Sequence, residues 1–118
     1  MNVLPPATVA SLGGRLTIDL GAIQRNWRAL DSISQGALTG AVVKADAYGC
    51  GIPAVAPALR AAGAQFFFTA TLEEAVAVRT SVPDAHIFVL NGILPRTAEI
   101  FAQYRLMPCL SSFPMLEE

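Results

Sequence analysis

Residues 63–90 read GAQFFFTATLEEAVAVRTSVPDAHIFVL and hold two apolar runs on either side of a helix-like segment. The first run, residues 65–70, is short and nearly continuous, which is typical of a buried strand. Thr71 is expected to cap the following helix, because the two glutamates of its first turn favour the positive end of a helix. Residues 86–90 form the second run. This stretch therefore predicts a strand–helix–strand unit with parallel strands.

The same alternation extends outward in both directions. Predicted strands cover residues 16–20, 38–44, 65–70, 86–90 and 106–110. Predicted helices run from Asp19 or Gly21 to about Ser34, from 53 to 62, onward from Thr71, from 95 to about 103, and from near Phe113. Such a chain fits either an open doubly wound sheet or part of a (β/α)8 barrel. Because a whole barrel takes roughly 200 or more residues, the 118 residues predict about half of one.

Composition narrows the class of protein. Hydrophobic residues make up 53% and charged residues 14% of the chain, so we expect it to hide surface against a partner or to be a piece of a longer protein. The net charge of −1 gives no basic field for nucleic acid.

Residues 1–14 are interpreted as a mobile leader without signal-peptide features, and 15–118 as the domain. No apolar run approaches the ~18 residues of a membrane span, and no metal-site spacing occurs. The two cysteines do not argue for a disulfide framework, which fits a cytoplasmic location.

The stretch AVVKADAYGCG, residues 41–51, contains the candidate residues for catalysis and ligand binding. Lys44 ends a predicted strand, and ligands gather at the carboxyl ends of parallel strands in both architectures. Alternation along the strand places Gly40, Val42 and Lys44 on one face. An amine in an apolar site favours its neutral form and is then a nucleophile toward carbonyl groups. Tyr48 adds a phenol able to donate to a phosphate. The alternative is a solvated lysine and a tyrosine packed in a loop.

The whole string resembles the pyridoxal-phosphate signature of alanine racemases, VVKADAYGHG. Four further stretches resemble the same family: LTIDLGAIQRNWRAL, GAQFFFTATLEEAVAVR with the family's EA…LR run, IFVLNG and YRLMPCLSS. Together they cover about residues 15–112. The resemblance implies a fold-type III enzyme with an amino-terminal (β/α)8 barrel and a carboxyl-terminal, mostly β domain. The strand at 16–20 is expected to join that second domain, and the whole protein to form a head-to-tail homodimer.

The resemblance also implies roles for individual residues. Lys44 would carry pyridoxal 5'-phosphate as an internal aldimine and act as the base on the D-alanine side. Tyr48 would contact the cofactor phosphate, and Leu90 would line the cofactor pocket. Cys50 departs from the family pattern, which often has histidine there, and this puts in doubt how the loop around Tyr48 is held. The family's second proton-transfer group, a tyrosine, lies later in the sequence, so this chain alone is expected to be inactive.

The function implied is the interconversion of L-alanine and D-alanine, which supplies D-alanine for peptidoglycan in the bacterial cytoplasm. Two other readings stay open: another fold-type III amino-acid racemase, and a pyridoxal-phosphate-binding regulatory protein without catalysis. The predicted strand at 16–20 argues against the regulatory protein, which lacks the second domain. His86 begins a strand and is therefore expected on the stability face of a barrel. Ser111 and Ser112 are expected to cap a helix rather than to bind phosphate.

Overall fold

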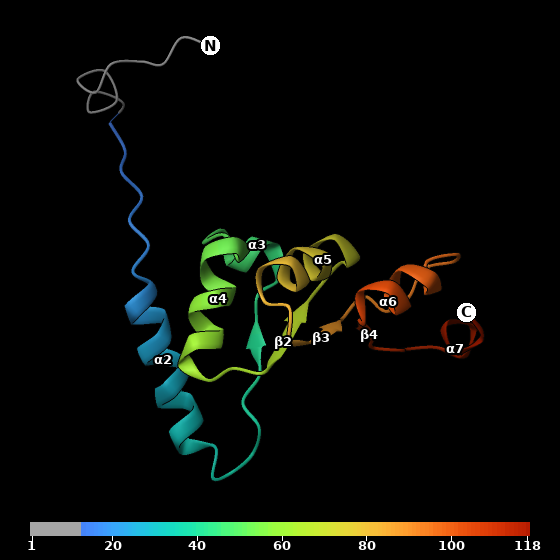
Figure 1. The fold of residues 1–118 in the computed structure, drawn as a ribbon, viewed down its shortest axis with the longest axis horizontal. Helices are drawn as coiled ribbons and strands as arrows, with labels where there is room; N and C mark the ends of the chain where they lie inside the picture. The colour runs from blue at the N-terminus through green and yellow to red at the C-terminus, as the bar shows by residue number, and fades with distance from the viewer. Residues whose placement is uncertain (1–12) are drawn as a thin grey trace.

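The computed structural model describes residues 13–118, so most of the predicted leader lies outside the described residues. Helices and strands alternate along the chain, as Figure 1 shows. In order, the elements are α2 (Leu20–Ile33), β1 (Ala41–Val42), α3 (Lys44–Tyr48), α4 (Ile52–Ala62), β2 (Phe66–Thr69), α5 (Leu72–Ser81), β3 (His86–Val89), α6 (Ala98–Tyr104), β4 (Met107–Pro108) and α7 (Phe113–Glu117).

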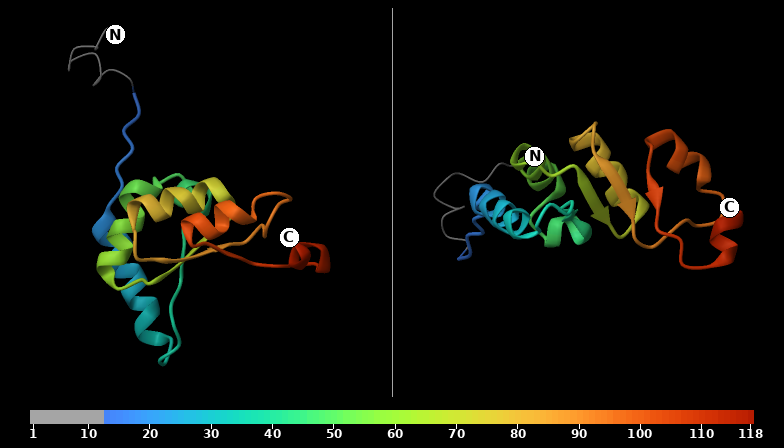
Figure 2. Two further views of the ribbon diagram at one scale, coloured as in Figure 1. Left: turned by 45° about the vertical axis from the view of Figure 1, so that its right-hand side comes forward. Right: turned by 90° about the horizontal axis from the view of Figure 1, so that it is seen from below.

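The four strands form one parallel sheet in the order β1-β2-β3-β4. Each strand lies beside the next strand of the chain, and the right-hand panel of Figure 2 shows them following one another across the molecule. A doubly wound sheet would reverse its strand order at a switch point. The strand order therefore confirms the prediction of a barrel segment and excludes the doubly wound alternative for these strands.

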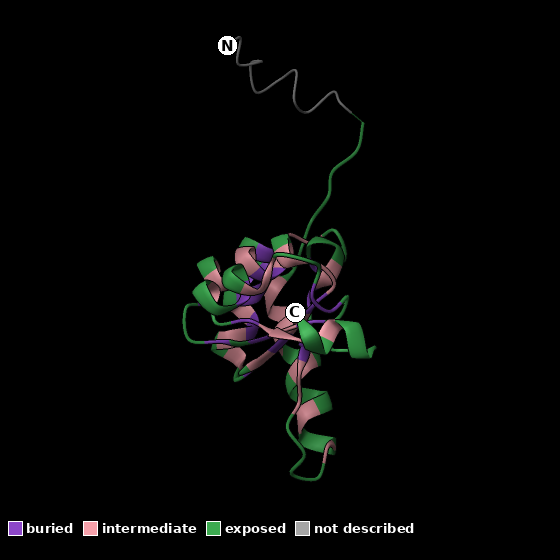
Figure 3. Cartoon of the chain, turned by 90° about the vertical axis from the view of Figure 1, so that its right-hand side faces the viewer, coloured by how far each residue is buried: buried purple, intermediate pink, exposed green. Residues whose placement is uncertain are grey.

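One face of the sheet is buried and the other is open. Phe67, Ile87 and Val89 are almost completely buried, whereas their neighbours Phe66 and Phe88 are only half-buried. The buried residues gather where the helices meet the sheet, as the purple segments of Figure 3 show. Helices that cover only one face of sequentially ordered parallel strands are the outer layer of a barrel.

The open face carries aromatic side chains from neighbouring strands. The rings of Phe68 and Phe88 stack with centroids 4.9 Å apart. Gly40 lies against the Phe68 ring, because a Cβ atom there would approach Phe68 Cε2 to 2.6 Å. The close contact places Gly40 on the open face with Phe68. Val42 is 47% exposed while Ala41 and Val43 are buried, so the predicted alternation along this strand is confirmed.

Capping side chains and a glycine set where three of the helices begin or end. Asp19 caps α2, since its Oδ1 accepts a hydrogen bond from the Ala22 N–H at 2.9 Å. Thr71 and Glu74 form a reciprocal capping box at the start of α5. Gly63 ends α4 with φ +124°, and a Cβ atom there would lie only 3.2 Å from Cζ3 of the Trp27 ring. These residues confirm the predicted starts and ends of α2 and α4 to within a residue or two, and the predicted start of α5.

Several predicted boundaries are wrong. Residues 14–19 have no regular structure, and Leu20 already belongs to α2, so no strand at 16–20 forms within residues 13–118. A strand requires a hydrogen-bonded neighbour. The second domain that this segment is expected to join is not among residues 13–118, so that pairing stays a prediction. The strands predicted at 38–44 and 106–110 shrink to two residues each. The helix predicted from 95 begins at Ala98.

Candidate active site

The candidate residues lie at the carboxyl ends of the parallel strands. Lys44 follows β1 and is half-buried at the first position of α3, not within the strand as predicted. Leu90 directly follows β3, where its N–H donates to the Thr69 carbonyl at 2.8 Å. Tyr48 ends α3 and is 65% exposed, and Leu90 is 42% exposed. Because parallel strands all end at one edge, the structure brings all three residues to the same side of the sheet.

Lys44 leads into a turn with left-handed backbone geometry. The φ/ψ angles are 52°/48° at Ala45, 51°/52° at Asp46 and 54°/45° at Ala47, and φ is 55° at Tyr48. Four successive non-glycine residues in this region are unusual, because each costs roughly 1–2 kcal/mol relative to the right-handed form. Backbone strain of this kind persists only where the surrounding contacts hold it.

The turn is held by contacts within itself and by contacts with the start of α4. Within the turn, the Ala47 N–H donates to the Val43 carbonyl at 2.9 Å, and Ala47 is itself buried. The Asp46 carboxylate accepts from the Ile52 N–H at 2.7 Å, and the Asp46 carbonyl accepts from the Gly51 N–H at 2.8 Å. Asp46 therefore ties the turn to the first residue of α4.

Glu74 holds the turn from the other side. Its Oε1 accepts from the Ala45 N–H at 2.7 Å, and its Oε2 accepts from the N–H groups of Ala70 at 2.9 Å and Thr71 at 3.3 Å. The first contact spans 29 residues of sequence. One carboxylate thus joins the loop that carries Lys44 to the loop that follows β2.

Arg79, the other charged member of the EA…LR run, acts at the opposite end of the sheet. Its guanidinium donates to the carbonyls of Tyr104, Pro83, Ala85 and Arg105 at 2.8, 2.9, 2.8 and 2.8 Å. Burial, followed by the nearby positive charge of Arg105, lowers the pKa of Arg79. The planar fork of donors fits several acceptors at once. Arg79 therefore fixes the two connections that enter β3 and β4.

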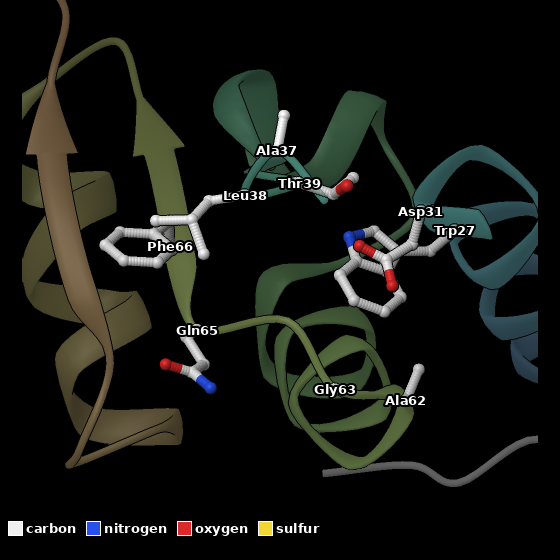
Figure 4. A pocket seen from close by; sticks show the side chains of 9 residues that line it. All are labelled: Trp27, Asp31, Ala37, Leu38, Thr39, Ala62, Gly63, Gln65 and Phe66. Carbon is white, nitrogen blue, oxygen red and sulfur yellow. The ribbon is translucent and has the colours of Figure 1, made fainter. Parts of the chain in front are cut away.

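A separate hollow lies at the amino-terminal ends of β1 and β2, away from Lys44. Figure 4 shows Trp27 and Asp31 of α2 on one side of it and Leu38, Gln65 and Phe66 on the other. The Trp27 Nε1 and Thr39 Oγ1 atoms are buried there without a hydrogen-bond partner among residues 13–118. The amino-terminal face of a barrel contributes to stability rather than to chemistry, so this hollow is not the candidate site.

Within residues 13–118, none of the remaining polar candidates forms a hydrogen bond with the lysine turn. His86 is exposed at the start of β3, as predicted, and stacks on Phe66 with centroids 5.0 Å apart. Ser112 precedes α7, but its side chain makes no capping hydrogen bond, and the Ser111 hydroxyl points to Met115 Sδ instead. Over residues 13–118 no group of His, Cys, Asp and Glu is arranged to hold a metal ion. No helix in the described part of the chain is long and apolar enough to cross a bilayer.

The sequence reasoning missed two residues that hold the site and one that holds the opposite end of the sheet. Asp46 and Glu74 anchor the lysine turn, and Arg79 fixes the far end of the sheet. The capping pattern Thr-x-x-Glu marks Glu74 as a helix-start residue. Nothing in that pattern reveals the contact with Ala45, because the partner is a backbone amide in another loop.

Sequential parallel strands with helices on one face, and a lysine in the turn after the first strand, define the amino-terminal part of a (β/α)8-barrel protein. A family model described as "Alanine racemase, N-terminal domain" matches residues 18–118. The chain therefore belongs to the alanine racemase family, which confirms the resemblance drawn from the lysine stretch.

Individual relatives agree with this assignment. The chain is 52% identical over 103 residues to the alanine racemase of Methylobacterium nodulans, an alignment that covers 87% of the chain and 28% of the relative. Among solved structures, alanine racemase from Bartonella henselae with covalently bound pyridoxal phosphate has 40% identity and a TM-score of 0.81, covering 85% of this chain and 28% of that one. Histidine racemase from Leuconostoc mesenteroides has 28% identity and a TM-score of 0.75, over 83% and 26%. The chain thus spans about 28% of the length of its alanine racemase relatives.

Proposed function

We propose that the protein carrying this chain interconverts L-alanine and D-alanine with pyridoxal phosphate as cofactor. The observation that carries the proposal is the placement of Lys44 in a strained, doubly anchored turn at the carboxyl end of β1. Such anchoring is expected where one amine has to be held in a defined direction. Membership of the alanine racemase family supports the same conclusion.

The residues at this edge fit the proposed cofactor. Lys44 supplies an amine for covalent attachment to an aldehyde, and the exposed Tyr48 hydroxyl is accessible as a donor to a phosphate. Leu90 offers an apolar surface beside the same edge. When bound, pyridoxal phosphate supplies the electron sink that lowers the barrier to removing the Cα proton of an amino acid. Lys44 would hold the cofactor before substrate arrives and then move the proton at Cα on one face.

The oligomeric state, the location and the use of the product are proposed from the family membership as well. We propose a head-to-tail homodimer in the cytoplasm of a bacterium, with the D-alanine product used for peptidoglycan. Large apolar side chains exposed in this chain support a larger assembly that covers them. They include Leu30, Ile33, Leu38, Leu110, Phe113 and Leu116.

Borohydride trapping tests the central claim. The intact protein is loaded with pyridoxal phosphate, reduced with borohydride, digested and mapped for the phosphopyridoxyl label. We expect the label on Lys44, which is the only lysine of this chain. The Lys44→Arg variant, which keeps the positive charge, is expected to lose the label. Label on a lysine outside this chain, with none on Lys44, would contradict the proposal.

A second candidate function is racemisation of a different amino acid. The similarity to histidine racemase favours keeping it, because related barrels act on side chains of different size. Initial rates of racemisation for L-alanine and L-histidine, measured with the same loaded protein, separate the two candidates. We expect L-alanine to react with the higher kcat/KM. If neither amino acid is racemised although Lys44 is labelled, the non-catalytic binding protein becomes the better reading.

A further inference from the structure

We propose that Glu74 is a positioning residue for Lys44. Its carboxylate holds the backbone amide of Ala45 and thereby sets the direction in which the Lys44 amine leaves the sheet. This inference rests on the proposed function only for the role of Lys44. The contact itself is a property of the fold.

The geometry of the contact is specific. The Ala45 N–H is the first amide after Lys44 and lies at the start of the left-handed turn, so no preceding turn of helix supplies an acceptor for it. Glu74 Oε1 is that acceptor at 2.7 Å. The other oxygen, Oε2, is held by the Ala70 and Thr71 amides at 2.9 and 3.3 Å. One carboxylate oxygen is therefore held by the loop after β2, while the other accepts from the loop that carries Lys44.

A carboxylate suits this place better than its amide analogue. Three N–H groups converge on two oxygens, and both oxygens act only as acceptors when the group is ionised. A glutamine has one acceptor oxygen and one NH2 group, so one of the two loops would face a donor. Hydrogen bonds to an ionised acceptor are also roughly twice as strong as neutral ones.

The consequence for Lys44 follows from its position in the chain. Lys44 is covalently joined to the anchored amide, so the contact restricts the backbone angles that aim its side chain. The left-handed turn is strained, and releasing it at Ala45 opens other backbone conformations. The amine would then sample more directions, and a smaller fraction of collisions with the cofactor aldehyde would lead to attachment.

Three variants of the intact protein separate this role from general destabilisation. Glu74→Gln replaces one of the two acceptor oxygens by an NH2 donor, with minimal change in size. Glu73→Gln is the matched control, since Glu73 is an exposed neighbour in the same helical turn and carries the same charge. Thr71→Ala weakens the α5 cap at the Glu74 amide, 3.4 Å from the Thr71 hydroxyl, without touching the Ala45 amide. For each, we would measure hydrogen exchange at the Ala45 amide without cofactor and the rate of borohydride-trappable attachment of pyridoxal phosphate to Lys44.

We expect Glu74→Gln to speed exchange at Ala45 and to slow attachment, each by roughly tenfold or more, as for the loss of a charge-assisted hydrogen bond. Glu73→Gln and Thr71→Ala should stay near wild type in both measurements. Unchanged attachment with faster exchange would reduce Glu74 to a structural role and overturn the proposal. The proposal would also be overturned if the Ala45 amide of the wild-type protein exchanged as fast as in an unstructured peptide. This second test does not depend on the folding of any variant.

The two proposals fail in different ways. No label on wild-type Lys44 would refute the proposed attachment site, and with it the positioning role, even if Ala45 exchange were slow. Label on wild-type Lys44 with equal attachment rates in Glu74→Gln would refute only the role of Glu74. Attachment is measured without alanine, so neither result depends on racemisation.

Discussion

Replacing Ala45 by glycine should stabilise the protein, although glycine usually weakens a helical segment. Ala45 has φ 52° and ψ 48°, which an L-residue with a Cβ atom adopts only with strain. Its side chain is exposed, so the change removes no packing from the core. The Ala45 N–H remains available to Glu74 after substitution. The matched control is Ala54→Gly, because Ala54 is also exposed but lies in the right-handed helix α4.

The magnitude follows from two opposing terms. Relief of the left-handed conformation contributes roughly 1–2 kcal/mol. The greater freedom of glycine in the unfolded chain opposes this by roughly 0.5–1 kcal/mol. Ala45→Gly should therefore raise the free energy of unfolding by about 0.75 kcal/mol, the middle of a range of roughly 0–1.5 kcal/mol. Ala54→Gly has only the unfavourable term and should lower it by about 0.5–1 kcal/mol.

Urea unfolding of the intact protein measures the stability of both variants. A shift in the midpoint with an unchanged slope reports a change in the free energy of unfolding. The expected result is that the two midpoints shift in opposite directions, and that the free energies of unfolding of the two variants differ by roughly 1–2 kcal/mol. A loss of stability in Ala45→Gly equal to that of Ala54→Gly would show that the turn is not left-handed. The argument for a strained, anchored lysine turn would then fail.

Two further substitutions probe other parts of the same framework. Tyr48→Phe should weaken binding of pyridoxal phosphate roughly ten- to a hundredfold, the effect of losing a charge-assisted hydrogen bond, while leaving the unfolding midpoint unchanged; equal cofactor dissociation constants would return Tyr48 to a packing role. Arg79→Gln should lower the free energy of unfolding by roughly 2–4 kcal/mol, because several carbonyls lose their donor. The exposed Arg28→Gln serves as its control in the same urea titration, and similar losses in both would contradict the role given to Arg79.

Much of the fold could be predicted because its signals are local. The apolar runs that become β2 and β3 are flanked by strong punctuation, with Gly63 before the first and Thr71 after it. Asp19 and Thr71 mark helix starts through hydrogen bonds to amides three residues ahead. Such signals depend on neighbouring residues only, so a single sequence contains them.

The misses share a physical cause, which is dependence on distant partners. The segment at 16–20 alternates like a strand, but alternation provides no hydrogen-bonded neighbour, and none pairs with it within residues 13–118. Lys44 was predicted as the last strand residue because the apolar run continues to it. The left-handed turn that follows contradicts the intrinsic preferences of alanine, aspartate and tyrosine. The contacts of Asp46 and Glu74, together with the buried Ala47, hold the chain in this conformation.

Two of the stretches that resemble the alanine racemase family, the lysine stretch and the one that contains Glu74, are therefore joined by a hydrogen bond. A left-handed turn after β1 leaves the Ala45 amide without an acceptor of its own, and an unpaired amide there would cost roughly 1–3 kcal/mol to the extent that it is shielded from water. The acceptor comes from Glu74, 29 residues later, in the helix that follows the next strand. A chain that kept the lysine motif but lost this glutamate would retain Lys44 without the contact that we propose directs its amine. The lysine stretch and the glutamate are thus better treated as one site than as two separate motifs.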